Sequence, residues 1–494
     1  MHPTLDVQVQ STSTIFPSTP LNKPTTTALS ILDNTSANFA RCAAIWYFPP
    51  SISTLTLNSN DLQVSLSHTL NSYRPWCGRL SYASSLFTTH GTQSARYQRI
   101  STTYNTPNDI GISLTVATSP HPLSLFLPSP STRKTCLKAW NAPGNLPSST
   151  LLPTTKLSIS SSSTANSPNV VIQLTTFACG SLAIGIAITH CLADALSLSK
   201  FANDWGLTTR SLTSSKSLSS LSPNLPELSP VFDPQRLDAH AAGDINGPPD
   251  EEIQRKAREL PQHRYDWYTP VSDQPWPNPK PKDFDDVVAR AAMDGEVGLS
   301  PSIPIPWGQW DTNLLISHRL LHFSREEILA IYKQANSGVV EKEKSDGDGN
   351  RISKHDALLA HLWSLIITSR NLPEGTTCYL DLTFGVRSRV DPPPPDGLLG
   401  SPVMHVAIPF TSTSNSLPTP SSNPKVDDEE LNGDMPLLDG LVEIMEAPRD
   451  QDQEKSGIDG GSVSWIDDGV DVSVFLEASA IERLLGNQRL WGGV

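Results

Sequence analysis

The sequence has few cysteines and none of the short motifs that mark common metal and nucleotide sites. Its 494 residues include six cysteines, and no two of them form C-x-x-C. Cysteines this sparse argue against a disulfide framework or a zinc knuckle. The sequence also contains no H-E-x-x-H, P-loop, G-x-G-x-x-G or G-x-S-x-G motif. We therefore predict no bound metal and no resident cofactor.

Charged residues are scarce as well, and basic residues are the scarcer kind. Charged residues make up 17% of the chain, with 36 Lys and Arg against 50 Asp and Glu and a formal net charge of −14. A nucleic-acid-binding protein usually carries a basic stripe, and no long Lys/Arg cluster occurs here. We therefore expect no nucleic-acid partner. A small anionic ligand stays compatible, because local basic groups or helix N-termini can bind it.

Long apolar runs are absent too. No stretch of about 20 apolar residues could form a membrane-spanning helix. The first 20 residues, MHPTLDVQVQSTSTIFPSTP, lack the basic and apolar regions of a signal peptide. The sequence thus predicts a cytoplasmic protein with no membrane partner, and we expect it to act as a monomer.

What the sequence does contain is two halves with mixed strand and helix patterns. A chain of 494 residues exceeds a typical domain of about 100–200 residues. We predict an N-terminal half over residues 1–215, a crossover linker over 216–300 and a C-terminal half over 301–494. Serine and proline fill residues 211–229, which favours a linker there. Within the crossover we expect a helix only near residues 248–261.

Hydrophobic periodicity and capping residues predict the individual elements. A helix is expected over residues 61–72, and a hairpin of two strands over 169–176 and 182–189. In the C-terminal half we expect helices that begin at the N-caps Ser324 and Ser353. The other elements predicted in that half are strands near 320–323, 378–386, 404–410, 441–448 and 470–476, and a last helix near 477–486.

One histidine lies where the fold could hold its side chain rigidly. The pattern H-x-x-x-D occurs at His2, His190 and His240, and about one chance match is expected in this composition, so the pattern alone decides nothing. His2 lies at a terminus and His240 lies in the polar crossover. His190 instead follows an apolar strand and precedes an amphipathic helix over residues 193–205. A strand-to-helix turn would therefore hold His190.

Five segments of the sequence, RPWCGRL, ITHCLADALS, ISKHDALLAHLW, FGVRSRVDPPPPDGLLGSPV and GVDVSVFLE, match motifs of one family. They resemble the BAHD acyltransferases, a coenzyme A-dependent plant and fungal family that includes trichothecene acetyltransferases. RPWCGRL resembles the family's Tyr-Pro-x-Ala-Gly-Arg-Leu stretch, and ITHCLADALS resembles its His-x-x-x-Asp segment. ISKHDALLAHLW resembles its Ser-x-x-Asp-Ala-Leu helix, FGVRSRVDPPPPDGLLGSPV its Arg-x-Arg and Gly-Asn segment, and GVDVSVFLE its terminal strand. The segments occur in family order over most of the chain. The resemblance implies a mixed α/β, two-domain chloramphenicol acetyltransferase-like fold with a central tunnel and a long crossover loop.

The resemblance also implies an activity and roles for three residues. Acyl-CoA, most simply acetyl-CoA, would be the co-substrate, and a hydroxyl or amine of a small secondary metabolite would accept the acyl group. His190 would be the general base, since its ordinary pKa of about 6.5 suits the task. Asp194 would orient the turn by pairing with Arg387. No residue of the sequence is assigned to binding coenzyme A.

Plainer interpretations of these residues stay open on the sequence alone. His190 could be a buried histidine held by a backbone carbonyl. Asp194 could be a carboxylate that stabilises a helix start, and Arg387 a solvated charge. Cys191 lies beside the histidine, but its apolar neighbours predict a core residue and not a nucleophile.

The sequence departs from the family in one segment. The Asp-Phe-Gly-Trp-Gly motif is expected between residues 410 and 439, where TSTSNSLPTPSSNPKVDDEELNGDMPLL stands instead. Either the sequence comes from an imperfect gene model, or a segment near 411–436 has been lost. A loss would favour an alternative function, a catalytically impaired homologue that binds a small molecule without turnover. A condensation-type partner ranks last, because it usually carries His-His-x-x-x-Asp and Thr189 stands at the first of these positions.

Overall fold

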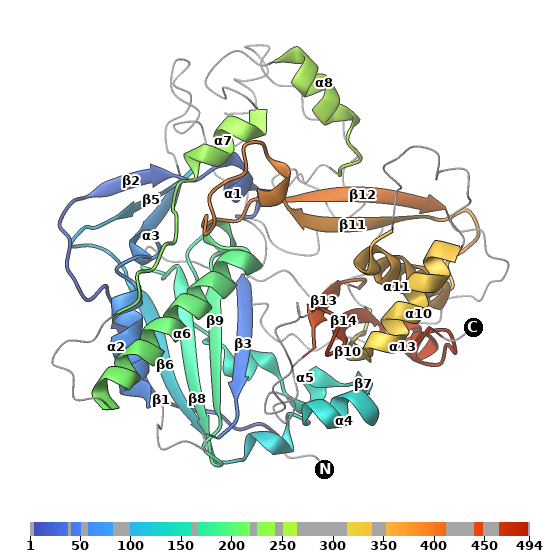
Figure 1. The fold of residues 1–494 in the computed structure, drawn as a ribbon, viewed down its shortest axis with the longest axis horizontal. Helices are drawn as coiled ribbons and strands as arrows, with labels where there is room; N and C mark the ends of the chain where they lie inside the picture. The colour runs from blue at the N-terminus through green and yellow to red at the C-terminus, as the bar shows by residue number, and fades with distance from the viewer. Residues whose placement is uncertain are drawn as a thin grey trace.

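The structure of the 494-residue chain is a computed structural model. It describes residues 4–37, 41–50, 58–82, 99–159, 166–217, 225–242, 250–263, 314–337, 352–411, 439–447 and 464–492. Within these residues the strands form four sheets of five, four, three and two strands. Together with the helices they give a mixed α/β architecture (Figure 1).

The N-terminal half is built on a five-stranded sheet with the strand order β1-β6-β8-β9-β3 (Figure 1). β6 and β8 run parallel, and the other neighbouring pairs are antiparallel. A three-stranded sheet has the order β2-β5-β4. The bounds are β1 (Gln8–Ile15), β2 (Thr25–Ala28), β3 (Cys42–Phe48), β4 (Arg79–Tyr82), β5 (Ile100–Tyr104), β6 (Ile112–Ser119), β8 (Val170–Phe177) and β9 (Leu182–Ile188).

The helices of this half include one that lies across the five-stranded sheet, α6 (Figure 1). Their bounds are α1 (Ile31–Thr35), α2 (Ser59–Thr69), α3 (Arg74–Cys77), α4 (Pro130–Thr135), α5 (Ala142–Asn145) and α6 (Ala195–Ser217), and the segment after this half adds α7 (Gln235–Ala242) and α8 (Glu251–Glu259). Short 3-10 turns are η2 (Leu123–Leu125), η3 (Ser148–Leu151) and η4 (His190–Leu192).

Aromatic packing fixes the first turns of α6 against α2 and α3. The Phe201 ring of α6 is fully buried, with its centroid 5.0 Å from that of Tyr73 and 5.2 Å from that of Trp76. The Trp205 indole N–H donates to the Leu62 carbonyl at 3.2 Å and lies 2.9 Å from the Ser65 hydroxyl. Because α6 begins five residues after His190, this packing also limits how far the preceding turn can move.

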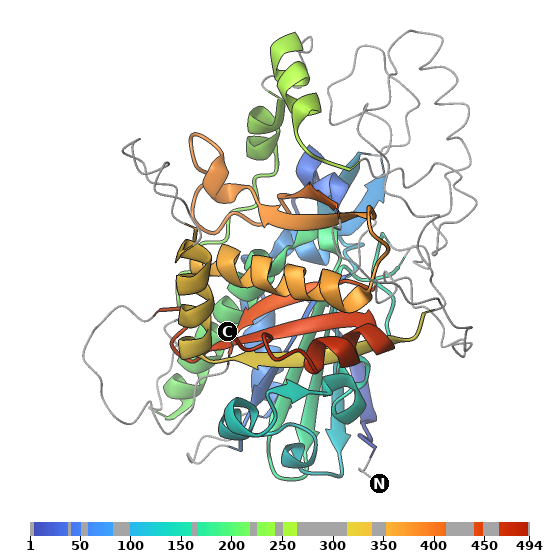
Figure 2. The ribbon, with the colours of Figure 1, turned by 90° about the vertical axis from the view of Figure 1, so that its right-hand side faces the viewer.

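The C-terminal half packs three helices on a four-stranded sheet with the order β13-β14-β10-β7 (Figure 2). Its core is formed by buried side chains such as Leu321, Ile328, Leu362, Val472 and Ile481. The bounds are β7 (Ala139–Trp140), β10 (Ile316–Phe323), α10 (Arg325–Ser337), α11 (Lys354–Arg370), β13 (Val442–Glu446), β14 (Val470–Glu477) and α13 (Ala478–Leu485). β7 precedes this half in the sequence and pairs antiparallel with β10, so an early segment supplies its edge strand.

A two-stranded ribbon reaches from one half toward the other. β11 (Thr377–Gly385) and β12 (Val403–Thr411) pair antiparallel over their full length. Their connection contains the 3-10 turn η7 (Arg387–Arg389) and lies against the N-terminal half, whereas the other end of the ribbon lies above α11 (Figure 1). The ribbon therefore brings residues near position 400 to the turn that contains His190.

Most predicted elements are confirmed. The hairpin of β8 and β9, the helices α2, α8, α10, α11 and α13, and the strands β10 to β14 all occur near their expected positions. The Glu327 N–H donates to Ser324 Oγ at 3.3 Å, and the Asp356 N–H donates to Ser353 Oγ at 3.0 Å. The two predicted N-caps therefore begin their helices.

Two expectations about the linker region are wrong. The Ser-rich stretch predicted to start a linker at residue 211 is helical as far as Ser217. The helix persists because the Thr209 hydroxyl bonds to Ser65 Oγ at 2.8 Å and ties α6 to α2, and tertiary contacts of this kind outweigh weak local propensity. The crossover also contains α7, so the helix near residues 248–261 is not alone.

Several expectations concern parts of the chain outside the described residues. These are His2, Asp244, residues 264–313 of the crossover and its surroundings, and 412–438, which include nearly all of the segment that lacks the Asp-Phe-Gly-Trp-Gly motif. In the described part of the chain, no helix combines the length and apolar character needed to cross a bilayer.

Two glycines give a matched test of this packing. A Cβ at Gly185 of β9 would collide with the Leu151 backbone carbonyl, whereas nothing lies within 4 Å of a Cβ at Gly206 of α6. We predict that Gly185→Ala lowers the free energy of unfolding by about 1–3 kcal/mol. Gly206→Ala should raise it by roughly 0.5–1 kcal/mol, since alanine favours helix. Thermal and urea denaturation would measure both, and equal effects would contradict the packing described.

Candidate active site

His190 lies at the end of β9, in the turn before α6. The last residue of β9, Ile188, pairs with Val170 on one side and Cys42 on the other, so the strand is held by two neighbours. The Thr189 N–H then donates to the Asn169 carbonyl at 2.9 Å. These contacts continue the sheet up to the residue before His190. The histidine is therefore carried by a rigid element of the N-terminal core.

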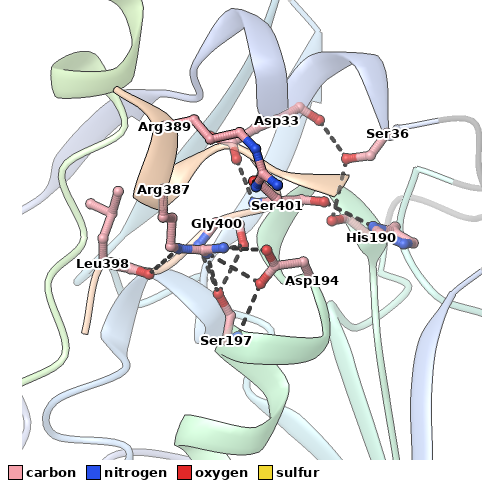
Figure 3. A network of polar contacts seen from close by, with 11 residues as sticks. Asp33, Ser36, His190, Asp194, Ser197, Arg387, Arg389, Leu398, Gly400 and Ser401 are labelled. Carbon is pink, nitrogen blue, oxygen red and sulfur yellow. Dashed lines mark hydrogen bonds and ion pairs between the residues drawn. The ribbon is translucent and has the colours of Figure 1, made fainter. Parts of the chain in front are cut away.

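Asp194 and Arg387 form an ion pair between two distant segments of the chain (Figure 3). Arg387 Nη2 donates to Asp194 Oδ1 at 3.1 Å, and Nη1 donates to Asp194 Oδ2. The guanidinium also donates to Ser197 Oγ at 3.0 Å and to the Gly400 and Leu398 carbonyls at 3.0 and 3.3 Å. Both side chains are largely buried. A buried charge paired and hydrogen-bonded in this way fixes the position of both segments.

The backbone of residue 400 reinforces the same junction. The Asp194 N–H donates to the Gly400 carbonyl at 3.1 Å, and Ser197 Oγ donates to the same carbonyl at 2.8 Å. Gly400 has φ of +129°, and a Cβ there would lie 2.6 Å from Asp33 Oδ1. Only glycine suits this position, because its backbone conformation and its close neighbour both exclude a side chain.

Asp33 is a third element of the junction. The carboxyl group is fully buried at the start of α1, where Ser30 and Asp33 form a capping box. Its Oδ1 accepts a hydrogen bond of 2.6 Å from the Ser401 N–H. Burial raises the pKa of Asp33 from 3.8 to about 6, although the hydrogen bonds from Ser30 and Ser401 and the charge of Arg387 work in the opposite direction. Asp33 thus holds the backbone of the residue that touches His190.

Ser401 makes the contact with the histidine ring. Its Oγ lies 2.9 Å from His190 Nδ1, while the Ser36 hydroxyl donates to the His190 backbone carbonyl at 3.4 Å (Figure 3). The pKa of His190 is lowered from 6.5, mainly by burial; its own backbone carbonyl and the Asp194 charge oppose that shift. A lowered pKa favours the neutral ring at neutral pH, which is the form that can accept a proton.

Other residues singled out in the sequence have simpler surroundings. Cys191 is fully buried, and burial together with the charge of Asp33 raises its pKa, so it is a core residue and not a nucleophile. His240 falls within α7, and its motif partner Asp244 lies outside the described residues. Asp356 caps α11, as its position at the helix start predicts. Among the described residues, no three His, Cys, Asp or Glu side chains gather in a way that could hold a metal ion.

Sequence reasoning missed three residues of this junction. Asp33, Ser197 and Ser401 lie far apart in the sequence and meet only in the fold. The S-x-x-D pattern at Ser30 predicts a helix cap but not a contact with residue 401. No local signal could have identified these residues, because their long-range partners lie 190 or more positions away.

The ion pair can be tested by a double-mutant cycle. We predict that Asp194→Ala and Arg387→Ala each lower the free energy of unfolding by about 3–5 kcal/mol, because each leaves a buried charge without its partner. The double variant should lose much less than the sum. Arg389→Ala is the matched control, since Arg389 lies in the same 3-10 turn but is exposed. Additive losses in urea denaturation would contradict the coupling.

The raised pKa of Asp33 predicts that the stability of the protein depends on pH. The folded protein binds the Asp33 proton more tightly than the unfolded chain does, because the pKa is about 6 in the fold against 3.8. The wild type should therefore lose roughly 3 kcal/mol of stability from this group as the pH rises from about 4 to 7. Asp33→Asn has no group that titrates at this position. The difference in free energy of unfolding between wild type and this variant should therefore shrink over the same pH range. Parallel stability curves for the two proteins would contradict the prediction.

Comparisons with known proteins show what the chain is similar to. A model of the Transferase family matches residues 5–89 and 137–258, a range that includes His190 and Asp194. Acyltransferase AFT15-1 of Alternaria alternata is 28% identical over 428 residues, which cover 82% of this chain and 72% of that protein. Acyltransferase abl6 of Leptosphaeria maculans is 25% identical over 417 residues, with 82% of this chain and 71% of that protein covered.

A solved structure has a similar fold. Vinorine synthase aligns over 97% of this chain and 98% of its own, with a TM-score of 0.53 and 16% sequence identity. At this identity the likeness concerns the fold, which is the two-domain chloramphenicol acetyltransferase-like fold expected from the sequence. The family match and the acyltransferase relatives point the same way: the chain is similar to the BAHD acyltransferases and is an acyltransferase.

Proposed function

We propose that the protein transfers an acyl group, most simply acetyl, from acyl-CoA to a hydroxyl or amine of a small secondary metabolite, with His190 as general base. The observation that carries the proposal is the setting of this ring. His190 stands at the end of a buried strand, its Nδ1 lies 2.9 Å from Ser401 Oγ, and its pKa is lowered by burial. A base that is neutral and held in one orientation suits proton abstraction at neutral pH.

The hydrogen-bond partners of His190 support one tautomer. Nδ1 lies 2.9 Å from Ser401 Oγ, a hydroxyl that can accept a hydrogen bond. In the proposal Nδ1 carries the hydrogen and donates it to this hydroxyl. Nε2 then carries the lone pair and is the atom that takes the proton of the acceptor.

The reaction follows from this arrangement. As the acceptor oxygen or nitrogen attacks the thioester carbonyl, its proton passes to His190 Nε2 and a tetrahedral oxyanion forms. The oxyanion then collapses, the carbon–sulfur bond breaks and the thiolate of coenzyme A takes the proton back from His190. The acyl group ends on the acceptor, and no covalent acyl-enzyme is required.

Asp194 and Arg387 serve the reaction through position and not through contact with substrate. Their carboxylate and guanidinium groups satisfy each other and the turn around Gly400. In the proposal this ion pair keeps His190 aligned while substrates bind and leave. We further propose that residues 1–215 and 301–494 form the two catalytic halves, that 216–300 is the crossover, and that both substrates meet in a tunnel between the halves. A monomer in the cytoplasm is part of the same proposal.

A second candidate function rests on the sequence. Residues 411–436 are a low-complexity sequence and stand in place of the family's Asp-Phe-Gly-Trp-Gly segment. A homologue that binds a small molecule but turns nothing over would be consistent with such a loss. The two candidates differ in one measurable quantity, the release of free thiol from acyl-CoA.

A thiol-release assay with acetyl-CoA and a panel of hydroxylated terpenoids tests the proposal. We expect turnover by the wild type and a loss of about 10²–10⁴-fold in kcat for His190→Gln, because the base is removed. His68→Gln is the control, since His68 lies on α2 and contacts Ser18 near the surface. A wild type without turnover, or a His190→Gln variant as active as wild type, would contradict the assignment.

The same assay predicts a pH profile. His190 acts in its neutral form, which is present above its pKa, and burial lowers that pKa from 6.5. Activity should therefore fall as the pH drops, with a midpoint below 6.5. A midpoint above 6.5 in kcat/KM for the acceptor would contradict the described environment.

A further inference from the structure

A second histidine lies near His190, on the ribbon that joins the two halves. His405 belongs to β12 and stands directly opposite Thr383 of β11 in the antiparallel register. His405 Nδ1 lies 2.9 Å from Thr383 Oγ1. Residues directly opposite each other in a ribbon point to the same face. Thr383 and His405 therefore form a polar pair on one face of the ribbon.

Two observations relate this pair to the proposed base. Ser401, whose Oγ contacts His190 Nδ1, precedes His405 by four residues, which span at most about 13–14 Å of extended chain. In addition, the charge of His190 acts on His405: burial and that charge both lower the pKa of His405. The two imidazoles are thus close enough to interact, and both favour the neutral state at neutral pH.

The next pair along the same face is covered by the crossover. Asp381 stands opposite Ala407, and the Ala407 N–H donates to the Pro261 carbonyl at 2.7 Å. His263 Nδ1 lies 3.1 Å from Asp381 Oδ1, and the ring is buried over this pair. Among the described residues of the ribbon, Thr383 and His405 form the polar pair between this covered position and Ser401. The crossover thus covers the ribbon on the side of this pair that is farther from Ser401.

We propose that His405 is a specificity-determining residue that hydrogen-bonds a second polar group of the acceptor while His190 takes the proton of the reacting group. This inference rests on the proposed function. A neutral imidazole can donate and accept hydrogen bonds, so it recognises a hydroxyl or a carbonyl equally well. The acceptor would then be a small oxygenated compound with a further hydroxyl or carbonyl group close to the one that reacts.

The acceptor fits this position better than the acyl donor does. An acetyl thioester presents only one oxygen, the reacting carbonyl oxygen, and no second polar group next to it. If His405 instead stabilised the oxyanion on that oxygen, its loss would slow the reaction of every acceptor equally. If His405 instead hydrogen-bonds a second polar group of the acceptor, removal of His405 slows the reaction only of acceptors that carry such a group.

Matched acceptors separate these roles. The thiol-release assay would use pairs of mono- and dihydroxylated terpenoids, such as menthol and p-menthane-3,8-diol, with acetyl-CoA. We expect the wild type to prefer the diol of at least one pair by about 10-fold or more in kcat/KM, and His405→Leu to abolish that preference. His405→Gln, which keeps hydrogen-bonding groups, should retain part of it. The KM for acetyl-CoA should be unchanged in both variants.

A control variant and the remaining outcomes make the test decisive. His361→Leu removes another partly buried histidine, on α11, whose Nε2 lies 3.0 Å from the Leu490 carbonyl, and it should keep the wild-type preference. A preference that survives His405→Leu, a wild type without any preference, or an equal loss with both members of a pair would overturn the role of His405. A wild type that releases no thiol with any acceptor would instead contradict the proposed function itself.

Discussion

The geometry of the site depends on one buried ion pair, between Asp194 and Arg387. These residues are 193 positions apart, and a guanidinium removed from water is stable only where its donors are satisfied. Here a carboxylate, a hydroxyl and two backbone carbonyls satisfy it. Since the acceptors come from the turn after β9 and from the connection between β11 and β12, the pair holds these two segments together. The position of His190 relative to the ribbon follows from that constraint.

The sequence predicted the parts of the site that are encoded locally. The apolar alternation before His190 and the amphipathic pattern after it predict a strand-to-helix turn, and the structure has β9, η4 and α6 there. The family resemblance also named Asp194 and Arg387, which the fold brings into contact. Asp33 and Ser401 could not be found in this way. Their roles depend on tertiary contacts with neighbours hundreds of residues away, and periodicity carries no information about such contacts.

The errors about the fold have the same origin. Serine and threonine near residue 213 have weak helix propensity, yet α6 continues because its buried face packs on α2. Propensity is therefore a poor guide wherever a helix gains its stability from a neighbour. The strand β7 is a related case, since two residues carry almost no periodic signal and are defined only by pairing with β10.

In the proposed mechanism the junction of β9, η7 and β12 is scaffold and His190 is the reacting group. The most direct test is a crystal structure with an unreactive acetyl-CoA analogue in which a methylene replaces the thioester sulfur. We predict that the carbonyl carbon of the analogue lies roughly 4–6 Å from His190 Nε2, which leaves room for an acceptor hydroxyl between them. An analogue bound with its carbonyl more than roughly 10 Å from that nitrogen, at a distance no proton transfer can bridge, would contradict the central claim.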